Sequence, residues 1–92
     1  MRGAVRFEFS RSLRHFWGGP ESLDVRATTL SEALREADAR IPGLAARVLD
    51  DTGAIRGYVH VFVNKEPVMS RPDGVALAPG DIVHVLPSVA GG

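Results

Sequence analysis

The types of the last residues indicate that the C-terminus of the chain takes part in a chemical reaction. The sequence closes on Leu86-Pro87-Ser88-Val89-Ala90-Gly91-Gly92, and we expect Gly92 to carry a free α-carboxylate. Glycine loses more backbone entropy on ordering than any other residue, and sequence usually matters least at chain ends, so a terminal glycine pair needs a reason. A tip without Cβ atoms can pass through a narrow channel that side chains would block. These residues therefore predict a carboxylate that is presented to the active site of another protein.

The segment before the glycines is predicted to hold this carboxylate away from the folded domain. A turn at Pro79-Gly80-Asp81 precedes a β-branched and leucine-rich run over residues 82–86, which is typical of a strand after a tight turn. Pro87 has no N–H and cannot continue a central ladder, so we expect a folded domain over residues 1–86 and a flexible tail over residues 87–92. Six extended residues span roughly 20 Å. We expect Gly92 to react, and the residues that pass into a partner's active site to be Gly91, Ala90, Val89 and Pro87.

Length and composition exclude several classes of protein. The 92 residues are enough for one domain with a single modest core. Eleven basic and eleven acidic residues cancel, which argues against an electrostatic nucleic-acid binder. There is no cysteine, which excludes disulfides, thiolate metal sites and a cysteine nucleophile. No apolar run is long enough for a signal peptide or a membrane span, so we expect a cytoplasmic protein without nucleic-acid or membrane partners.

Hydrophobic periodicity divides the chain into strands and one main helix. Thr29 and Glu32 have the spacing of a capping box, and apolar residues then recur at helical intervals, which predicts a helix over residues 30–40. Residues 44–49 are predicted to add another helical turn. Residues 10–20 are predicted to form a loop whose aromatic side chains cover one end of the core. Alternating residues predict strands over residues 5–9, 22–26, 58–63 and 82–86, with a short edge strand at Val68 and Met69.

This order of elements predicts an α+β fold. The first two strands form an antiparallel hairpin, and the main helix crosses over to pack on one face of a mixed sheet of four to five strands. Helical cover on one face leaves the other face open, and an exposed apolar surface usually marks a partner site. We therefore expect a partner to dock on the open face, over His60, Phe62, Ile82, His84 and Leu86.

Other residues that are capable of chemistry have simpler interpretations. His60 and His84 can share a metal only if their strands are adjacent, and no third ligand is apparent, so we expect no metal site. Asp50 and Asp51 precede Thr52-Gly53 and are interpreted as turn residues rather than as an acid and base pair. No nucleophile, base and oxyanion donors are recognisable together, so we expect no catalytic residues and no independent enzyme.

The predicted loop over residues 10–20 offers two further candidates. Arg11 and Arg14 either contact an acidic partner or are solvated, and solvation is the simpler interpretation. Gly18-Gly19 lacks the lysine, the serine and the spacing of a phosphate-binding loop, and Pro20 follows it. The chain itself is therefore expected to bind no nucleotide cofactor.

Three motifs together resemble a known family. They are Val61-Phe62-Val63-Asn64, then Leu77 with Pro79-Gly80-Asp81 and Val83, and the terminal run from Leu86 to Gly92. In these motifs the chain resembles the ubiquitin-like sulfur carriers, the ThiS and MoaD group of β-grasp proteins. The ending is most similar to carriers that serve thiocarboxylate-dependent cysteine synthesis. Small subunits of molybdopterin synthase often have a second proline where this chain has Ser88.

The resemblance implies a chemical cycle at Gly92. A terminal carboxylate, with a pKa of about 3.5, is ionised and unreactive towards nucleophiles at neutral pH. In the family, an adenylating enzyme of the ubiquitin-activating type uses ATP and Mg²⁺ to form an acyl-adenylate, and sulfide or a persulfide then displaces AMP to leave a thiocarboxylate. The implied sulfur acceptor is a synthase: cysteine synthase-like, thiazole synthase-like, or the large subunit of molybdopterin synthase. ATP and Mg²⁺ belong to the activating enzyme, and the carrier holds no cofactor.

Two other functions fit the same residues. The chain could be the small subunit of molybdopterin synthase, with its tail held in a large catalytic subunit. It could also be a ubiquitin-like protein modifier or an interaction module, with a terminal carboxylate that forms an isopeptide or is not used. The sulfur carrier remains the leading hypothesis because the terminal glycine pair follows the strand and turn described above.

Overall fold

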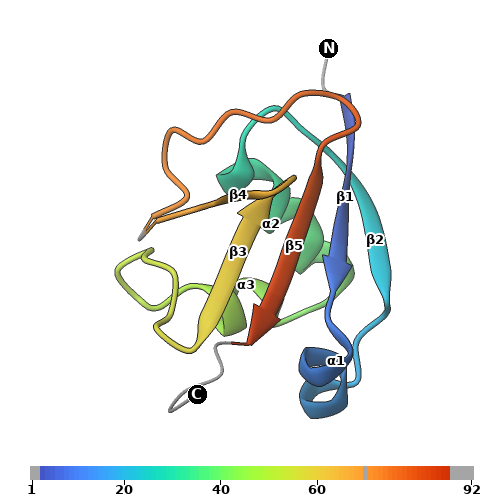
Figure 1. Cartoon of the computed structure of the whole chain (residues 1–92), viewed down its shortest axis with the longest axis vertical. Coiled ribbons are helices and arrows are strands. Elements are labelled where there is room, and N and C mark those ends of the chain that lie inside the picture. Colours follow the sequence, from blue (N-terminus) through green and yellow to red (C-terminus); the bar gives the residue numbers. More distant parts are fainter. Residues whose placement is uncertain (1–2, 70, 88–92) are drawn as a thin grey trace.

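The structure, a computed structural model, describes residues 3–69 and 71–87. The helices lie between the first and the third strand in the sequence, and the arrangement of the elements can be followed in Figure 1. In chain order the elements are β1 (Gly3–Phe9), α1 (Arg11–Trp17), β2 (Ser22–Ala27), α2 (Leu30–Arg40), α3 (Leu44–Val48), β3 (Val59–Val63), β4 (Glu66–Pro67) and β5 (Ile82–Pro87).

The strands form one mixed sheet in the order β2-β1-β5-β3-β4. The pair β1 and β5 is parallel, whereas β1 with β2, β3 with β5, and β3 with β4 are antiparallel. Figure 1 shows α2 lying across one face of this sheet. The predicted hairpin of the first two strands and the predicted α+β, β-grasp arrangement are therefore confirmed, with β5 at the centre of the sheet.

The core lies between the sheet and the helices. Alternating residues of the central strands point into it, so that Phe7 and Val83 are both 0% exposed. The α2 residues that recur at helical spacing meet them from the other side, and they are likewise buried: Leu30, Ala33, Leu34 and Ala37. Alternate residues of the strands and the residues at helical spacing in α2 are therefore buried in the same core, as the sequence predicted.

The main helix begins and ends where its caps predict. The Thr29 hydroxyl accepts a hydrogen bond from the Glu32 backbone N–H at 3.1 Å. The Glu32 carboxylate in turn accepts from the backbone N–H of Thr28 at 2.8 Å, one residue before the cap. The first bond satisfies an N–H group that the first helical turn leaves without an intrahelical partner, and the second ties the residue before the cap to the helix.

The prediction of a loop over residues 10–20 is wrong, because this segment contains α1. The Ser10 hydroxyl caps the helix by accepting from the Leu13 N–H at 3.1 Å, and Gly18 ends it in the left-handed region at φ 69°. Leu13 and Trp17 pack against the core. The Trp17 ring meets Phe9 edge-on, with 5.2 Å between the ring centroids. One aromatic of this segment therefore does cover an end of the core, and it does so from a helix.

The predicted edge strand is displaced by two residues, from Val68 and Met69 to β4 at Glu66–Pro67. The hairpin closes earlier because Asn64 adopts a φ of 58°, which asparagine tolerates better than most residues, and Val63 then pairs with Glu66. The predicted end of the last strand is also early by one residue. Pro87 belongs to β5 and pairs with Val59, which a proline can do at the end of a ladder because it lacks only the donor.

Candidate functional site

The predicted reactive residue lies beyond the end of the central strand. Gly92 and the predicted tail residues Gly91, Ala90 and Val89 fall outside the described residues, so the site is the surface around Pro87, where β5 ends. Figure 1 shows this end near α1, at the end of the sheet where the parallel strands β1 and β5 both finish. The backbone N–H of Ser10 donates to the Val85 carbonyl at 3.1 Å and joins the start of α1 to β5. The end of β5 is therefore held by a neighbour on each side.

The five residues predicted as a docking surface lie together on the open face of the sheet. His60 pairs with Leu86, and Phe62 pairs with His84, across β3 and β5. The His60 and Phe62 rings are 6.4 Å apart. Ile82 completes the row on β5, and its neighbours Val83 and Val85 face the core. The pairing of β3 with β5 thus brings residues of two distant segments into one surface. Its role in docking remains a prediction.

Sequence reasoning missed the charged half of this face. The parallel pairing of β1 with β5 sets Glu8 beside His84, where Oε1 and Nδ1 are 3.7 Å apart. Arg6 lies beside Ile82 and donates from Nε to Asp24 Oδ1 at 3.0 Å. The hydrogen bond and charge of Asp24 raise the pKa of the Arg6 guanidinium further above its ordinary value. Only the strand order could reveal these neighbours, because β1 and β5 are more than seventy positions apart.

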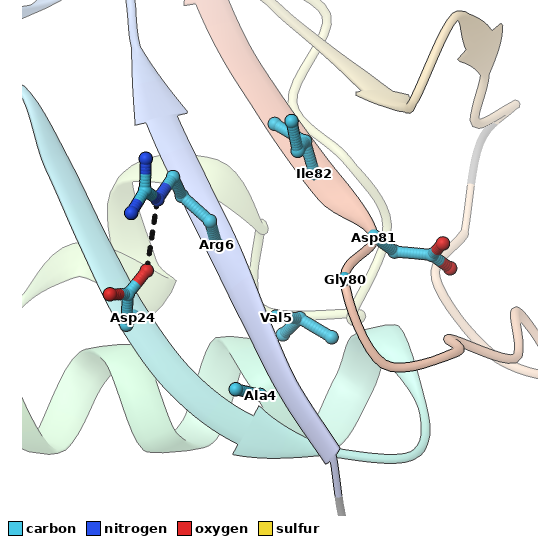
Figure 2. A pocket seen from close by; sticks show the side chains of 7 residues that line it. All are labelled: Ala4, Val5, Arg6, Asp24, Gly80, Asp81 and Ile82. Carbon is cyan, nitrogen blue, oxygen red and sulfur yellow. Dashed lines mark hydrogen bonds and ion pairs between the residues drawn. The ribbon is translucent and has the colours of Figure 1, made fainter.

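A hollow of about 310 Å³ lies at the opposite end of β5 and is drawn in Figure 2. The Arg6 guanidinium is turned towards Asp24, whereas the Asp81 side chain points away from both (Figure 2). The Asp81 carboxylate accepts from the Ala78 N–H at 2.8 Å and from Asn64 Nδ2 at 3.2 Å. These charged groups already have partners within the chain, so the hollow offers no prepared acid, base or anion site.

The other residues that the sequence offered as candidates for catalysis or metal binding do not form such a site among the described residues. Asp50 Oδ1 accepts from the N–H and the hydroxyl of Thr52 and from the Ala54 N–H, which confirms the turn interpretation. These hydrogen bonds, that of the Thr52 hydroxyl first, hold the pKa of Asp50 below its ordinary value of 3.8. Among residues 3–69 and 71–87, no three histidine or carboxylate side chains lie close enough together to hold a metal ion. In the same residues, no helix combines the length and apolar character needed to cross a membrane.

Two known proteins are similar to this chain in sequence. The sulfur carrier protein CysO of Mycobacterium tuberculosis (strain ATCC 25618 / H37Rv) is 35% identical over 83 residues, which are 87% of this chain and 89% of that protein. Small archaeal modifier protein 3 of Haloferax volcanii is 41% identical over 66 residues, which are 70% of each chain. Both alignments cover more than two thirds of this chain and of the relative.

Solved structures of CysO proteins are also similar to this chain. The crystal structure of Mycobacterium tuberculosis CysO superposes with a TM-score of 0.79 at 31% identity, over 92% of this chain and 99% of that one. A crystal structure of the Amycolatopsis orientalis BexX/CysO complex contains a chain with a TM-score of 0.76 at 27% identity, over 96% of this chain and 99% of that one. In that second structure a relative of this chain is bound to a partner protein.

The model of the ThiS family matches residues 8–92, which include β2 to β5, the end of β1 and the terminal glycines. The relatives are small sulfur carriers and ubiquitin-like modifiers with the same β-grasp fold. The chain therefore belongs to the ThiS family.

Proposed function

We propose that this protein carries sulfur as a thiocarboxylate on Gly92 and delivers it to a biosynthetic synthase. The observation that carries the proposal is the family match, which runs to Gly92 itself and not only over the folded domain. The name of the mycobacterial relative, sulfur carrier protein CysO, supports the choice of cargo. The position of β5 supports the mechanism, because this central strand ends at Pro87, five positions before Gly92.

The carboxylate needs activation before it can accept sulfur. An adenylating enzyme transfers AMP from ATP, with Mg²⁺, to the Gly92 carboxylate and releases pyrophosphate. Sulfide then attacks the acyl carbon, the bond to AMP breaks, and AMP leaves with the bonding pair, so that the glycine ends in a thiocarboxylate. In the delivery step the thiocarboxylate sulfur attacks an electrophilic carbon of the acceptor, and a carbon–sulfur bond forms as a leaving group departs from that carbon or its π bond opens. Water then cleaves the acyl–sulfur bond, which leaves the sulfur on the acceptor and restores the Gly92 carboxylate.

The two partners are an adenylating enzyme and a sulfur-accepting synthase. The solved BexX/CysO complex supports the second, because a relative of this chain is bound there to another protein. In this chain the open face, with Phe62, His84 and Leu86 in register, is the proposed docking surface. Cysteine synthesis is the proposed pathway, because the ending of this chain resembles the carriers that serve it and the mycobacterial CysO matches 87% of this chain in sequence and 92% in structure.

Intact-mass measurement tests the proposal. The protein is incubated with its adenylating enzyme, ATP, Mg²⁺ and a sulfide source, and we expect the mass to rise by the difference between sulfur and oxygen. A variant without Gly92 is the control and should show no rise. Adenylation of the full-length protein without any gain of sulfur would show that Gly92 does not carry a thiocarboxylate.

A second candidate function is protein modification. The 41% identity with small archaeal modifier protein 3 is the observation that favours it. If the protein is a modifier, cell extract supplied with ATP should yield higher-mass conjugates that disappear when Gly92 is deleted. Conjugates without a thiocarboxylate would favour the modifier, and a thiocarboxylate without conjugates would favour the carrier.

A further inference from the structure

Two arginine–aromatic pairs lie at the end of the sheet where β5 stops. The guanidinium carbon of Arg47 lies 5.8 Å from the ring centroid of Trp17, and that of Arg56 lies 6.0 Å from the ring centroid of Tyr58. Arg56 Nε donates to the Ala46 carbonyl at 2.8 Å, which joins the second pair to α3, the helix that carries Arg47. The four residues form one connected surface, called here the arginine–aromatic belt: Trp17, Arg47, Arg56 and Tyr58.

The belt flanks the point at which the chain leaves the sheet. Tyr58 immediately precedes Val59, which pairs with Pro87. On the other side, Trp17 contacts Phe9, and Phe9 pairs with Val85. Figure 1 shows α1 and the beginning of β3 at the end of the sheet where β5 finishes. Any protein that takes in the residues after Pro87 therefore has its entrance close to the belt.

The belt has the composition of a binding surface. Tyr58 is 59% exposed, and only one other large hydrophobic side chain among the described residues is as open. Tryptophan, tyrosine and arginine are the residue types that most often dominate binding energy at interfaces. An arginine that lies over an aromatic ring is already oriented, so it loses less conformational freedom when a partner binds.

The charge of the belt selects the partner. Within residues 3–69 and 71–87, neither Arg47 nor Arg56 forms an ion pair with a carboxylate. Asp50 is within electrostatic reach of Arg56, but its Oδ1 is occupied by the hydrogen bonds of its own turn. The belt therefore presents two positive charges on a protein whose formal net charge is zero. Guanidinium groups pair with carboxylates and with phosphates, and the carboxylate is the anionic group that the surface of an unmodified protein supplies.

We propose that the arginine–aromatic belt docks against an acidic rim around the active-site entrance of the adenylating enzyme. This inference rests on the proposed function, in which Gly92 enters that active site and the surface around Pro87 faces its rim. The belt lies beside the end of β5, whereas the row of Phe62, His84 and Leu86 runs along the open face. The belt is thus a cationic surface that is separate from the row on the open face.

Charge reversal at Arg47 tests the belt, because this exposed side chain makes no hydrogen bond to residues 3–69 or 71–87 that the fold would lose. Arg47→Glu and Tyr58→Ala are compared with Arg35→Glu, a reversal at an exposed position on α2. Binding to the adenylating enzyme is measured by titration calorimetry without ATP, and adenylation by pyrophosphate exchange. Thermal unfolding of each variant shows that the fold is intact.

We expect Arg47→Glu to raise both Kd and the KM for the carrier about tenfold or more, with kcat unchanged and a weaker dependence of Kd on salt. Tyr58→Ala should weaken binding without changing the salt dependence, and Arg35→Glu should stay within about twofold of the original protein. Unchanged binding of Arg47→Glu would overturn the belt while leaving Gly92-dependent thiocarboxylation standing. A change confined to the KM for ATP would also overturn it, because the arginine would then contact the nucleotide. If no thiocarboxylate forms at all, the proposed function is wrong. The binding of the variants to the adenylating enzyme without ATP then still shows whether the belt contacts that enzyme.

Discussion

The two faces of β5 alternate residue by residue but have different surroundings. On one face Val83 and Val85 are 0% and 1% exposed within the core. On the other face Ile82, His84 and Leu86 are only partly covered, because no helix lies over them. One strand therefore contributes to stability with one face and leaves the other face available to a partner. Substitutions on the two faces should separate stability from docking.

The largest expected effect is on the core face. Phe7→Ala removes a side chain that is fully buried on β1, and we expect it to lower the free energy of unfolding by about 3–5 kcal/mol. The matched control is Phe62→Ala on the open face, where partial burial predicts a loss of about 1 kcal/mol. Urea unfolding of both variants measures the difference. Equal losses would mean that the two faces contribute alike to stability.

The second expected effect is on docking. Phe62→Ala and Leu86→Ala should raise the Kd for the sulfur-accepting synthase about tenfold, because each removes apolar contact at the centre of the predicted docking surface. Ser31→Ala on α2, on the helix side of the sheet, is the control and should bind like the original protein. Calorimetry with the folded variants checks this. Binding that is unaffected by both substitutions would assign the synthase to another surface.

A third, smaller effect tests the helix that covers the core face. Thr29→Ala removes the hydroxyl that caps α2 and should lower the free energy of unfolding by about 1 kcal/mol. Thr28→Ala is the control, since its hydroxyl makes only a long contact of 3.4 Å to Glu32. Thermal or urea unfolding gives both values. A larger loss at Thr28 than at Thr29 would contradict the assignment of the cap.

The smallest effect concerns acid stability, and it lies away from both faces. The pKa of Asp50 is lower in the folded protein than its ordinary value of 3.8, so its ionised form stabilises the turn above that value. This stabilisation disappears as the pH falls through the lower, folded pKa. Asp50→Asn should therefore flatten the loss of stability below about pH 4. Unfolding curves of the variant and of the original protein between neutral and acid pH would show the difference, and parallel curves would contradict it.

Local signals in the sequence were sufficient for several elements. The bounds of α2 follow from Thr29, Glu32 and the helical spacing of apolar residues, and all of these act within a few positions of one another. The alternation of Val83 and Val85 with Ile82, His84 and Leu86 likewise assigns each residue to a face of β5. These predictions are confirmed because helix caps and strand alternation depend on near neighbours.

The helix α1 was not predicted, although the sequence contains local signals for it. Ser10 and Gly18 stand at the two ends of the helix as its caps, and Leu13 and Trp17 are four residues apart on the side that packs against the core. The glycines and Pro20 that follow suggested a loop. A helix of seven residues is stabilised mainly by packing against the rest of the protein. The sequence alone does not show that Trp17 packs on Phe9.

The sequence by itself determined the terminal glycine pair, the main helix and the inward and outward residues of each strand, because these depend on composition and on short-range periodicity. Only the tertiary structure decided that β5 lies between β1 and β3, which sets Glu8 beside His84 and brings Trp17, Arg47, Arg56 and Tyr58 around the end of that strand. The physical reason is that strand order and helix docking arise from contacts between distant segments, whose pairing no local pattern specifies.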